Sequence, residues 1–192
     1  MMITILPLGM LQTNCYLLAN GSRCLAIDPG GEPEKVLSFL EKQGLTLEAI
    51  LLTHGHFDHV GGVTALAAET DCSVYLCEED LSLPAAMTAG PLYHTHSYSE
   101  GDRLNVAGLD FTVLHTPGHT PGSVCLQFGE HLFTGDTLFA GSCGRTDFPG
   151  SSPAAMKKSL SRLAAMEENF HVYPGHGETT TLDEEKRYNP FL

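Results

Sequence analysis

Residues 53–59, Thr-His-Gly-His-Phe-Asp-His, contain four side chains of metal-ligand type within six positions. They continue a short apolar run, and together these residues predict a strand over Ala49–Thr53 that is buried on both faces. Imidazole and carboxylate groups at this density are hard to bury, because each buried polar group needs a partner. A cation satisfies several such groups at once. The heptad therefore predicts a metal site at the C-terminal end of a strand, where α/β folds tend to place chemistry.

The spacing within the heptad suits two cations. His54 and His56 are two residues apart, so in an extended backbone their side chains point the same way and can bind one ion. Asp58 and His59 then turn toward a second position. Such a pair of neighbouring ions is the arrangement of two-metal hydrolysis. The alternative is a surface loop that happens to be rich in histidine.

Length and charge limit the function classes. The 192 residues fit a single domain, 1–192, and the formal net charge of −13 argues against a nucleic-acid partner, because phosphate binding depends on a basic surface. Residues 1–8 lack the basic and apolar segments of a signal peptide, and no apolar run approaches the roughly 18 residues of a membrane span. We expect a cytoplasmic protein with no membrane partner. The sequence does not indicate an oligomeric state.

Cysteine usage agrees with this compartment. No C-x-x-C pair is present, and the spacing does not match a zinc ribbon. Without a secretory signal we expect reduced thiols, with zinc or redox chemistry at cysteine as the less favoured alternative. The six cysteines are Cys15, Cys24, Cys72, Cys77, Cys125 and Cys143.

Strand and helix patterns alternate along the chain. Strands are expected at Met2–Pro7, Cys15–Ala19, Arg23–Ile27, Ala49–Thr53, Arg103–Val106, Asp110–Leu114, Ser123–Phe128, His131–Thr134 and His171–Tyr173. Helices are expected at Glu32–Gln43, at Val63–Glu69 and from Pro153 onward. The segment 84–101 is the least regular, and both a loop over a site and a plain surface excursion suit it.

Three further segments can complete two coordination shells. His119 lies in the turn Thr116–Gly122, Asp136 follows an apolar strand, and His176 ends Tyr-Pro-Gly-His. Each alone has a simpler interpretation, since a lone histidine is usually structural and an aspartate is often a turn former. Together with the heptad they strengthen the prediction of a metal centre.

In this order, the motif H-x-H-x-D-H followed by His119, Asp136 and His176 resembles the metallo-β-lactamase superfamily, over essentially all 192 residues. The resemblance implies an α/β fold, a four-layer αβ/βα sandwich of two mixed sheets flanked by helices. It also implies two sets of metal ligands and one further ligand that both cations share. One cation is then held by His54, His56 and His119, the second by Asp58, His59 and His176, and Asp136 bridges both.

Within the superfamily the chain is most similar to the glyoxalase II (hydroxyacylglutathione hydrolase) group. The segments T-H-x-H-x-D-H, P-G-H-T-P-G-S, G-D and Y-P-G-H-G all stand in that form, and Gly144–Phe148 resembles a compact bacterial subgroup. Larger members carry an additional C-terminal helical domain that helps to hold glutathione. This chain ends at Leu192, soon after His176, which leaves the thiol carrier open.

The implied activity is hydrolysis of a small-molecule thioester, S-2-hydroxyacylglutathione or a similar thiol ester, by a hydroxide that bridges two divalent cations. Zinc is the expected metal, with iron or manganese as alternatives. Asp58 and Asp136 are expected to orient the attacking water as well as bind metal. Arg145 is the candidate for the substrate carboxylate, because guanidinium binds carboxylates bidentately. A structural ion pair between Arg145 and an acid such as Asp147 is the alternative of equal weight.

Other chemistries are less favoured. The G-R-T-D-F run also resembles an iron-dependent persulfide dioxygenase, which implies a single iron on His54, His119 and Asp136. That group typically has an aspartate after the last histidine, where this chain has Gly177, and one iron leaves the second ligand set without a role. Lactonase and phosphodiesterase chemistries remain open. A β-lactamase role is disfavoured because no secretory signal is evident. A metal-stabilised binding module is disfavoured because structural zinc sites often use cysteine.

Overall fold

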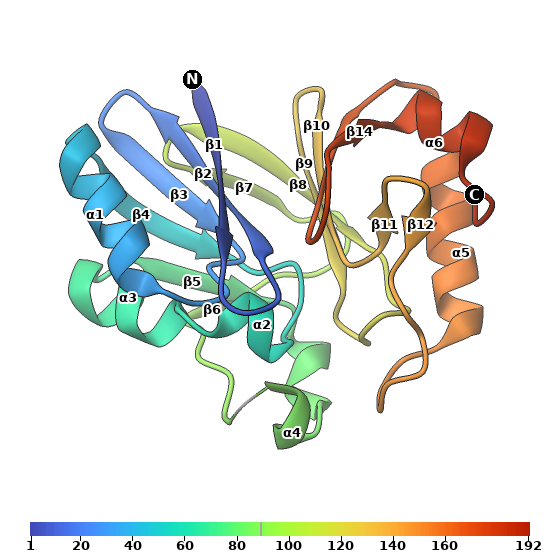
Figure 1. The fold of residues 1–192 in the computed structure, drawn as a ribbon, viewed down its shortest axis with the longest axis horizontal. Helices are drawn as coiled ribbons and strands as arrows, with labels where there is room; N and C mark the ends of the chain where they lie inside the picture. Colours follow the sequence, from blue (N-terminus) through green and yellow to red (C-terminus); the bar gives the residue numbers. More distant parts are fainter. Residues whose placement is uncertain (89) are drawn as a thin grey trace.

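Two sheets face each other in the computed structural model, which describes residues 1–88 and 90–192. Within this described part each sheet has six strands (Figure 1). The first sheet has the order β1 (Met2–Leu8), β2 (Thr13–Asn20), β3 (Arg23–Ile27), β4 (Thr46–Leu51), β5 (Ser73–Leu76) and β6 (His96–Ser97). The second has the order β14 (Thr180–Thr181), β13 (His171–Pro174), β10 (His131–Gly135), β9 (Val124–Phe128), β8 (Leu109–His115) and β7 (Arg103–Val106).

Helices cover the outer faces of both sheets. Figure 1 shows α1 (Pro33–Gln43) and α3 (Val63–Thr70) beside the first sheet, and α5 (Pro153–Ala164) and α6 (Leu182–Tyr188) beside the second. The α/β class and the four-layer arrangement expected from the resemblance are confirmed. The shorter elements are α2 (Phe57–Val60), η1 (a 3-10 helix, Glu78–Ser82), α4 (Ala85–Thr88) and the hairpin of β11 (Leu138–Phe139) and β12 (Ser142–Cys143).

The layers follow from strand alternation, because successive side chains of a strand point to opposite faces. On β4, Ile50 packs toward α1 and α3, whereas Ala49 and Leu51 pack between the two sheets. Beyond the second sheet, α5 buries Met156 and Leu160 against strand residues. The described residues thus form three hydrophobic layers: between the first sheet and its helices, between the two sheets, and between the second sheet and its helices. β4 is buried on both faces, as its apolar sequence predicts.

Several element boundaries differ from the prediction for identifiable reasons. The strand expected at Ala49–Thr53 begins earlier, at Thr46, and ends at Leu51. It ends there because the Thr53 N–H donates to the Asp28 carboxylate, at 2.7 Å, instead of joining the ladder. The first helix begins at Pro33, since Glu32 has a φ of 44° at the N-cap position. All the cysteines that the structure describes carry free thiols, as expected.

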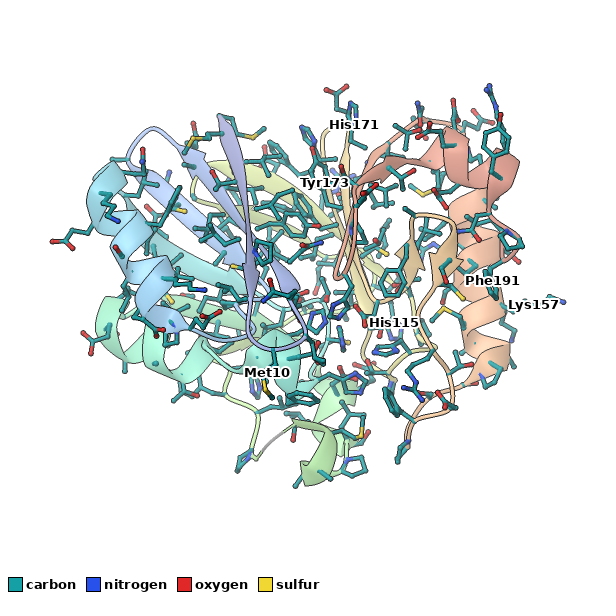
Figure 2. The ribbon with its side chains drawn as sticks, in the orientation of Figure 1. Met10, His115, Lys157, His171, Tyr173 and Phe191 are labelled. Atoms are coloured by element: carbon teal, nitrogen blue, oxygen red, sulfur yellow. The ribbon has the colours of Figure 1, made fainter. Side chains whose placement is uncertain are left out.

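Strand direction places the C-terminal ends at a common edge. β3 and β4 are parallel, β10 and β13 are parallel, and β8 runs with β10 because both are antiparallel to β9. Figure 2 shows the consequence: His171 at the start of β13 lies at the top of the view, and His115 at the end of β8 lies well below it. At this lower edge the Val124 N–H donates to the Thr53 carbonyl, at 2.9 Å, and so joins the two sheets. Across the described ranges, no helix is both long and apolar enough to span a membrane.

Candidate metal centre

All seven residues predicted as ligands follow the C-terminal ends of strands and meet at this edge. The loop after β4 carries His54 and His56, and α2 carries Asp58 and His59. The ends of β8, β10 and β13 supply the remaining ones, His119, Asp136 and His176. Most of these side chains are buried, and His59 is fully inaccessible to solvent. The structure therefore brings together every residue of the predicted centre.

The first donor set is His54, His56 and His119. One ring nitrogen of each lies within 4.8 Å of one ring nitrogen of the other two. His56 Nδ1 is 2.8 Å from His119 Nε2, and the two rings stand nearly perpendicular, at 86°. Two ring nitrogens at this distance need a proton or a cation between them, because two lone pairs would repel.

The second donor set is Asp58, His59 and His176, again with donor atoms within 4.8 Å of one another. Asp58 Oδ2 is 3.2 Å from His176 Nε2 and 3.6 Å from His59 Nε2. The His54 and His59 ring centroids are 4.0 Å apart, so the two sets are immediate neighbours. This arrangement matches the partition that the family resemblance implies.

Asp136 lies between the sets. Its Oδ1 is 3.4 Å from His59 Nε2, in the second set, and its Oδ2 is 3.4 Å from His119 Nε2, in the first. Oδ2 is also 3.7 Å from His176 Nε2, so this carboxylate is a close neighbour of both groups of donors, as expected of a bridging ligand.

The donor atoms fit divalent cations. The Nε2 atoms of His54, His56 and His59 and the Oδ1 atom of Asp136 are buried and have no hydrogen-bond partner among the described residues. Unpaired buried polar atoms are rare in proteins, because each costs roughly 1–3 kcal/mol. Imidazole nitrogen and carboxylate oxygen are the donors that zinc and iron accept. The unpaired atoms and their chemistry thus point to the same kind of occupant.

Hydrogen bonds on the far side of two rings set their tautomers. His119 Nδ1 lies 2.8 Å from the Arg145 carbonyl, which can only accept, so Nδ1 carries the proton and Nε2 the lone pair. His59 Nδ1 lies 2.9 Å from Asp28 Oδ2, with the same result. In its neutral form each ring therefore turns a lone pair toward the centre, as metal-ligating histidines do.

The pKa values of the first set favour neutral imidazole. Burial, followed by the neighbouring His59, holds the pKa of His54 well below its usual range. Burial and His119 lower the pKa of His56 to about 4. Near neutral pH both rings are therefore uncharged, which is the form that binds a cation.

The second set holds paired charges. Burial acts to lower the pKa of His59, but Asp136 and Asp28 outweigh it and raise that pKa well above its usual value. For His176, burial is outweighed by the hydrogen bond to Asp58, so its pKa is also raised. Burial acts to raise the pKa of Asp58, but His176 and His59 bring it well below its usual range. The neighbouring carboxylates thus favour the protonated form of both rings, and a cation would compete with these protons.

Sequence reasoning missed two supporting residues. Asp28, directly after β3, is buried, and its carboxylate accepts from the Thr53 N–H, from Thr53 Oγ1 at 2.6 Å and from the His59 ring. Its oxygens are thereby occupied, so it orients His59 although it lies near the donors. Thr13 Oγ1 donates to Asp58 Oδ2 at 2.9 Å. The available signal for Asp28 was its place directly after a strand, which Asp136 shares.

A pocket of about 380 Å³ opens above the two donor sets. Its apolar wall consists of Leu11, Phe57, Met87, Phe139, Cys143 and Phe148. Arg145 is the one lysine or arginine among its described lining residues. The Arg145 guanidinium binds Asp147 through two hydrogen bonds of 2.7 Å and lies over the Phe148 ring, 4.0 Å from its centroid. The ion-pair alternative for Arg145 is therefore present in the structure, at the rim of the pocket.

The segment 84–101 lies beside the site, although Ala89 is outside the described residues. Met87 lines the pocket, and the buried Tyr98 hydroxyl donates to the Leu52 carbonyl just before the heptad. Of the two interpretations left open by the sequence, the structure therefore supports a segment that borders the site.

Comparison with known proteins agrees with the geometry. The Metallo-beta-lactamase superfamily profile matches residues 8–176. The chain belongs to the metallo-β-lactamase superfamily. Over its full length it is 37% identical to the hydroxyacylglutathione hydrolase GloC of Haemophilus influenzae, of which it covers 98%.

Solved structures of this superfamily superpose closely. The B3 metallo-β-lactamase BLEG-1 gives a TM-score of 0.90 at 37% identity, with 100% of this chain and 99% of that one covered. TTHA1623, solved in a di-iron-bound form, gives 0.88 at 44% identity, with 98% and 100% covered. ETHE1 from Myxococcus xanthus gives 0.84 at 31% identity, with 99% and 84% covered. These relatives share the fold of this chain over nearly its whole length.

Proposed function

We propose that this metallo-hydrolase superfamily member hydrolyses thioesters at a binuclear centre. In the proposal His54, His56 and His119 hold one cation, and Asp58, His59 and His176 hold the other. The observation that carries it is Asp136, whose two oxygens each lie 3.4 Å from a histidine of a different donor set. Two complete sets that share one carboxylate favour a two-metal hydrolase over a single-metal enzyme.

When bound, two divalent cations supply Lewis acidity and an activated water molecule. Asp58 and Asp136 accept hydrogen bonds from this water and orient it toward the substrate carbonyl. Its oxygen adds to the carbonyl carbon, the C–S bond breaks, and a carboxylic acid and a thiol are released. A thiol has a pKa of roughly 8.5, so the leaving group needs no strong general acid. This suits the pocket. Among its described lining residues, the titratable ones are proposed metal ligands, together with Cys143 and Arg145.

The pocket supports a small thioester with an apolar part. Its volume of about 380 Å³ is at the lower end of the range for small-molecule sites. The apolar wall suits an acyl chain or the carbon skeleton of a thiol carrier, and Arg145 suits a carboxylate. Similarity to GloC supports a hydroxyacylglutathione as the first substrate to test. We propose zinc as the metal, with iron as the alternative that the di-iron form of TTHA1623 supports.

A single-iron persulfide dioxygenase is the second candidate. His54, His119 and Asp136 alone make a two-histidine, one-carboxylate set, and the similarity to ETHE1 is consistent with it. This candidate gives no role to Asp58, His59 and His176, whose donor atoms are nevertheless within 4.8 Å of one another. The second set therefore favours the hydrolase.

Metal analysis combined with parallel assays separates the candidates. The purified protein, loaded with Zn²⁺ or Fe²⁺, is assayed for thiol release from S-D-lactoylglutathione, for oxygen uptake on glutathione persulfide and for hydrolysis of a β-lactam. The proposal expects about two metals per chain and thiol release. One iron per chain with oxygen uptake would overturn it in favour of the dioxygenase. Hydrolysis of the β-lactam alone would overturn the substrate class.

A further inference from the structure

Asp80, in η1, is a buried carboxylate that belongs to neither donor set. Its side chain is inaccessible to solvent. Oδ2 accepts from the Gly55 N–H at 2.7 Å and from Thr120 Oγ1 at 2.9 Å, and Oδ1 accepts from the Gly122 N–H at 2.6 Å. Among the ion pairs of the described residues, none involves Asp80. A buried carboxylate without an ion-pair partner is stabilised by its hydrogen bonds alone.

All three donors lie in the two loops that carry the first donor set. Gly55 stands between His54 and His56, and Thr120 follows His119. These loops leave different sheets, since one follows β4 and the other follows β8. One carboxylate from a third segment therefore joins the two loops across the gap between the sheets.

The fit around the carboxylate is close enough to fix the loops. A Cβ added to Gly55 would stand 3.3 Å from Asp80 Cβ, and one added to Gly122 would stand 2.8 Å from Asp80 Cγ. Both backbones approach the carboxylate only because they carry no side chain there. Thr120 is itself held, because Ser123 Oγ accepts from its N–H at 3.0 Å. Each loop thus has little freedom to move relative to Asp80.

We propose that Asp80 is a positioning residue that sets the separation of the two loops, and thereby the spacing of His54, His56 and His119 as ligands. The contact that depends on this spacing joins the same two loops, since His56 Nδ1 lies 2.8 Å from His119 Nε2. Asp28 is bound by His59 and Thr53, neither of which is a partner of Asp80. The two buried aspartates therefore hold separate sets of groups, and only Asp80 joins the loop of His54 and His56 to the loop of His119.

Asp80→Asn tests the role. The amide keeps the size of the side chain but turns two N–H donors toward groups that are themselves donors, so one loop contact is lost. Glu185→Gln is the matched control, because Glu185 is also a buried carboxylate that accepts from a glycine N–H, at 2.8 Å from Gly141, and it contacts neither loop. Thr120→Val removes the hydroxyl that donates to Asp80 and that also contacts Ser123 Oγ at 2.8 Å, and it serves if Asp80→Asn does not fold.

The measurement is Zn²⁺ titration of each metal-free variant against a competing chelator, which gives two stepwise dissociation constants. His56→Ala and His176→Ala assign each step to its donor set. Asp80→Asn is expected to weaken the step of His54, His56 and His119 by roughly tenfold or more and to leave the other step within about threefold. Thr120→Val is expected to weaken the same step by a smaller factor.

The control separates positioning from general destabilisation. Glu185→Gln is expected to lower the thermal unfolding temperature without changing either constant. If Asp80→Asn, or Thr120→Val in its place, keeps both constants at the wild-type values while the protein is merely less stable, Asp80 is structural only and the inference is wrong. The inference rests on the proposed metal centre. Because the titration contains no substrate, its result is independent of whether thioesters are hydrolysed.

Discussion

His59 Nδ1 lies 2.9 Å from Asp28 Oδ2, although the two residues are 31 positions apart in the chain. Both side chains are buried, and the same carboxylate also accepts two hydrogen bonds from Thr53. One aspartate therefore fixes the start of the ligand-bearing loop and the tautomer of the histidine near its end. This relationship helps to hold α2, a helix of only four residues, so that it presents Asp58 and His59 to a cation.

Asp28→Asn should weaken the second cation site. The amide offers one acceptor where the carboxylate offers two, so it cannot serve both Thr53 and His59. We expect roughly 10- to 100-fold weaker binding of the cation held by Asp58, His59 and His176, measured by chelator competition. Asp110→Asn, at an exposed carboxylate that accepts from Asn105, is the control and should change nothing. Wild-type affinity in Asp28→Asn would show that His59 needs no such partner.

Asp136→Ala should lose most bound metal and activity together. Its carboxylate is the group closest to both donor sets, and its removal leaves His59 and His119 without their shared neighbour. We expect a fall from about two metals per chain to one or fewer, and at least about a 100-fold loss of thiol release. Metal content is read by elemental analysis after dialysis. Two retained metals would contradict the bridging role.

The sequence singles out the proposed ligands, which the structure brings together, because they are chemically distinctive and lie near strand ends. A histidine or aspartate shortly after an apolar strand stands out, and His54, His119 and Asp136 are all in this position. The family pattern then groups residues far apart in the chain. Asp28 was missed because an aspartate before Pro-Gly-Gly has the composition of a turn, and its partners at 53 and 59 are not local.

Elements without apolar periodicity were also missed. β5 has four residues, too few for a clear alternation, and α6 is charged along most of its length, with Leu182 and Glu185 buried. Asp80 lies in a Glu-Glu-Asp run, which from sequence alone indicates a solvated surface, yet it is inaccessible. In each case the tertiary partner, rather than the local pattern, determines the structure.

Arg145→Ala should impair binding of a substrate that carries a carboxylate near the rim. We expect KM to rise by about tenfold for such a thioester, the cost of one charge-assisted hydrogen bond, with little change in kcat. An uncharged thioester should show no change in KM, and Asp147→Asn should lower KM for the carboxylate substrate by freeing the guanidinium from its partner. Equal effects on both substrates would show that Arg145 has a structural role, through its contacts with Asp147 and Phe148.

Metal loading should release protons near neutral pH. In the metal-free protein neighbouring carboxylates raise the pKa values of His59 and His176, so both rings keep a proton to higher pH than a free imidazole does. A cation needs the lone pair, so binding displaces the protons that these rings hold, and we expect release of up to about two protons per chain loaded with two ions. Because protons compete with the cation, affinity should increase as pH rises toward the raised pKa values and level off above them.

Calorimetry in two buffers of different ionisation enthalpy counts the protons, and His176→Ala should release about one fewer. Uptake of metal at pH 7 without proton release would mean that both rings are already neutral and that the carboxylates do not hold them charged.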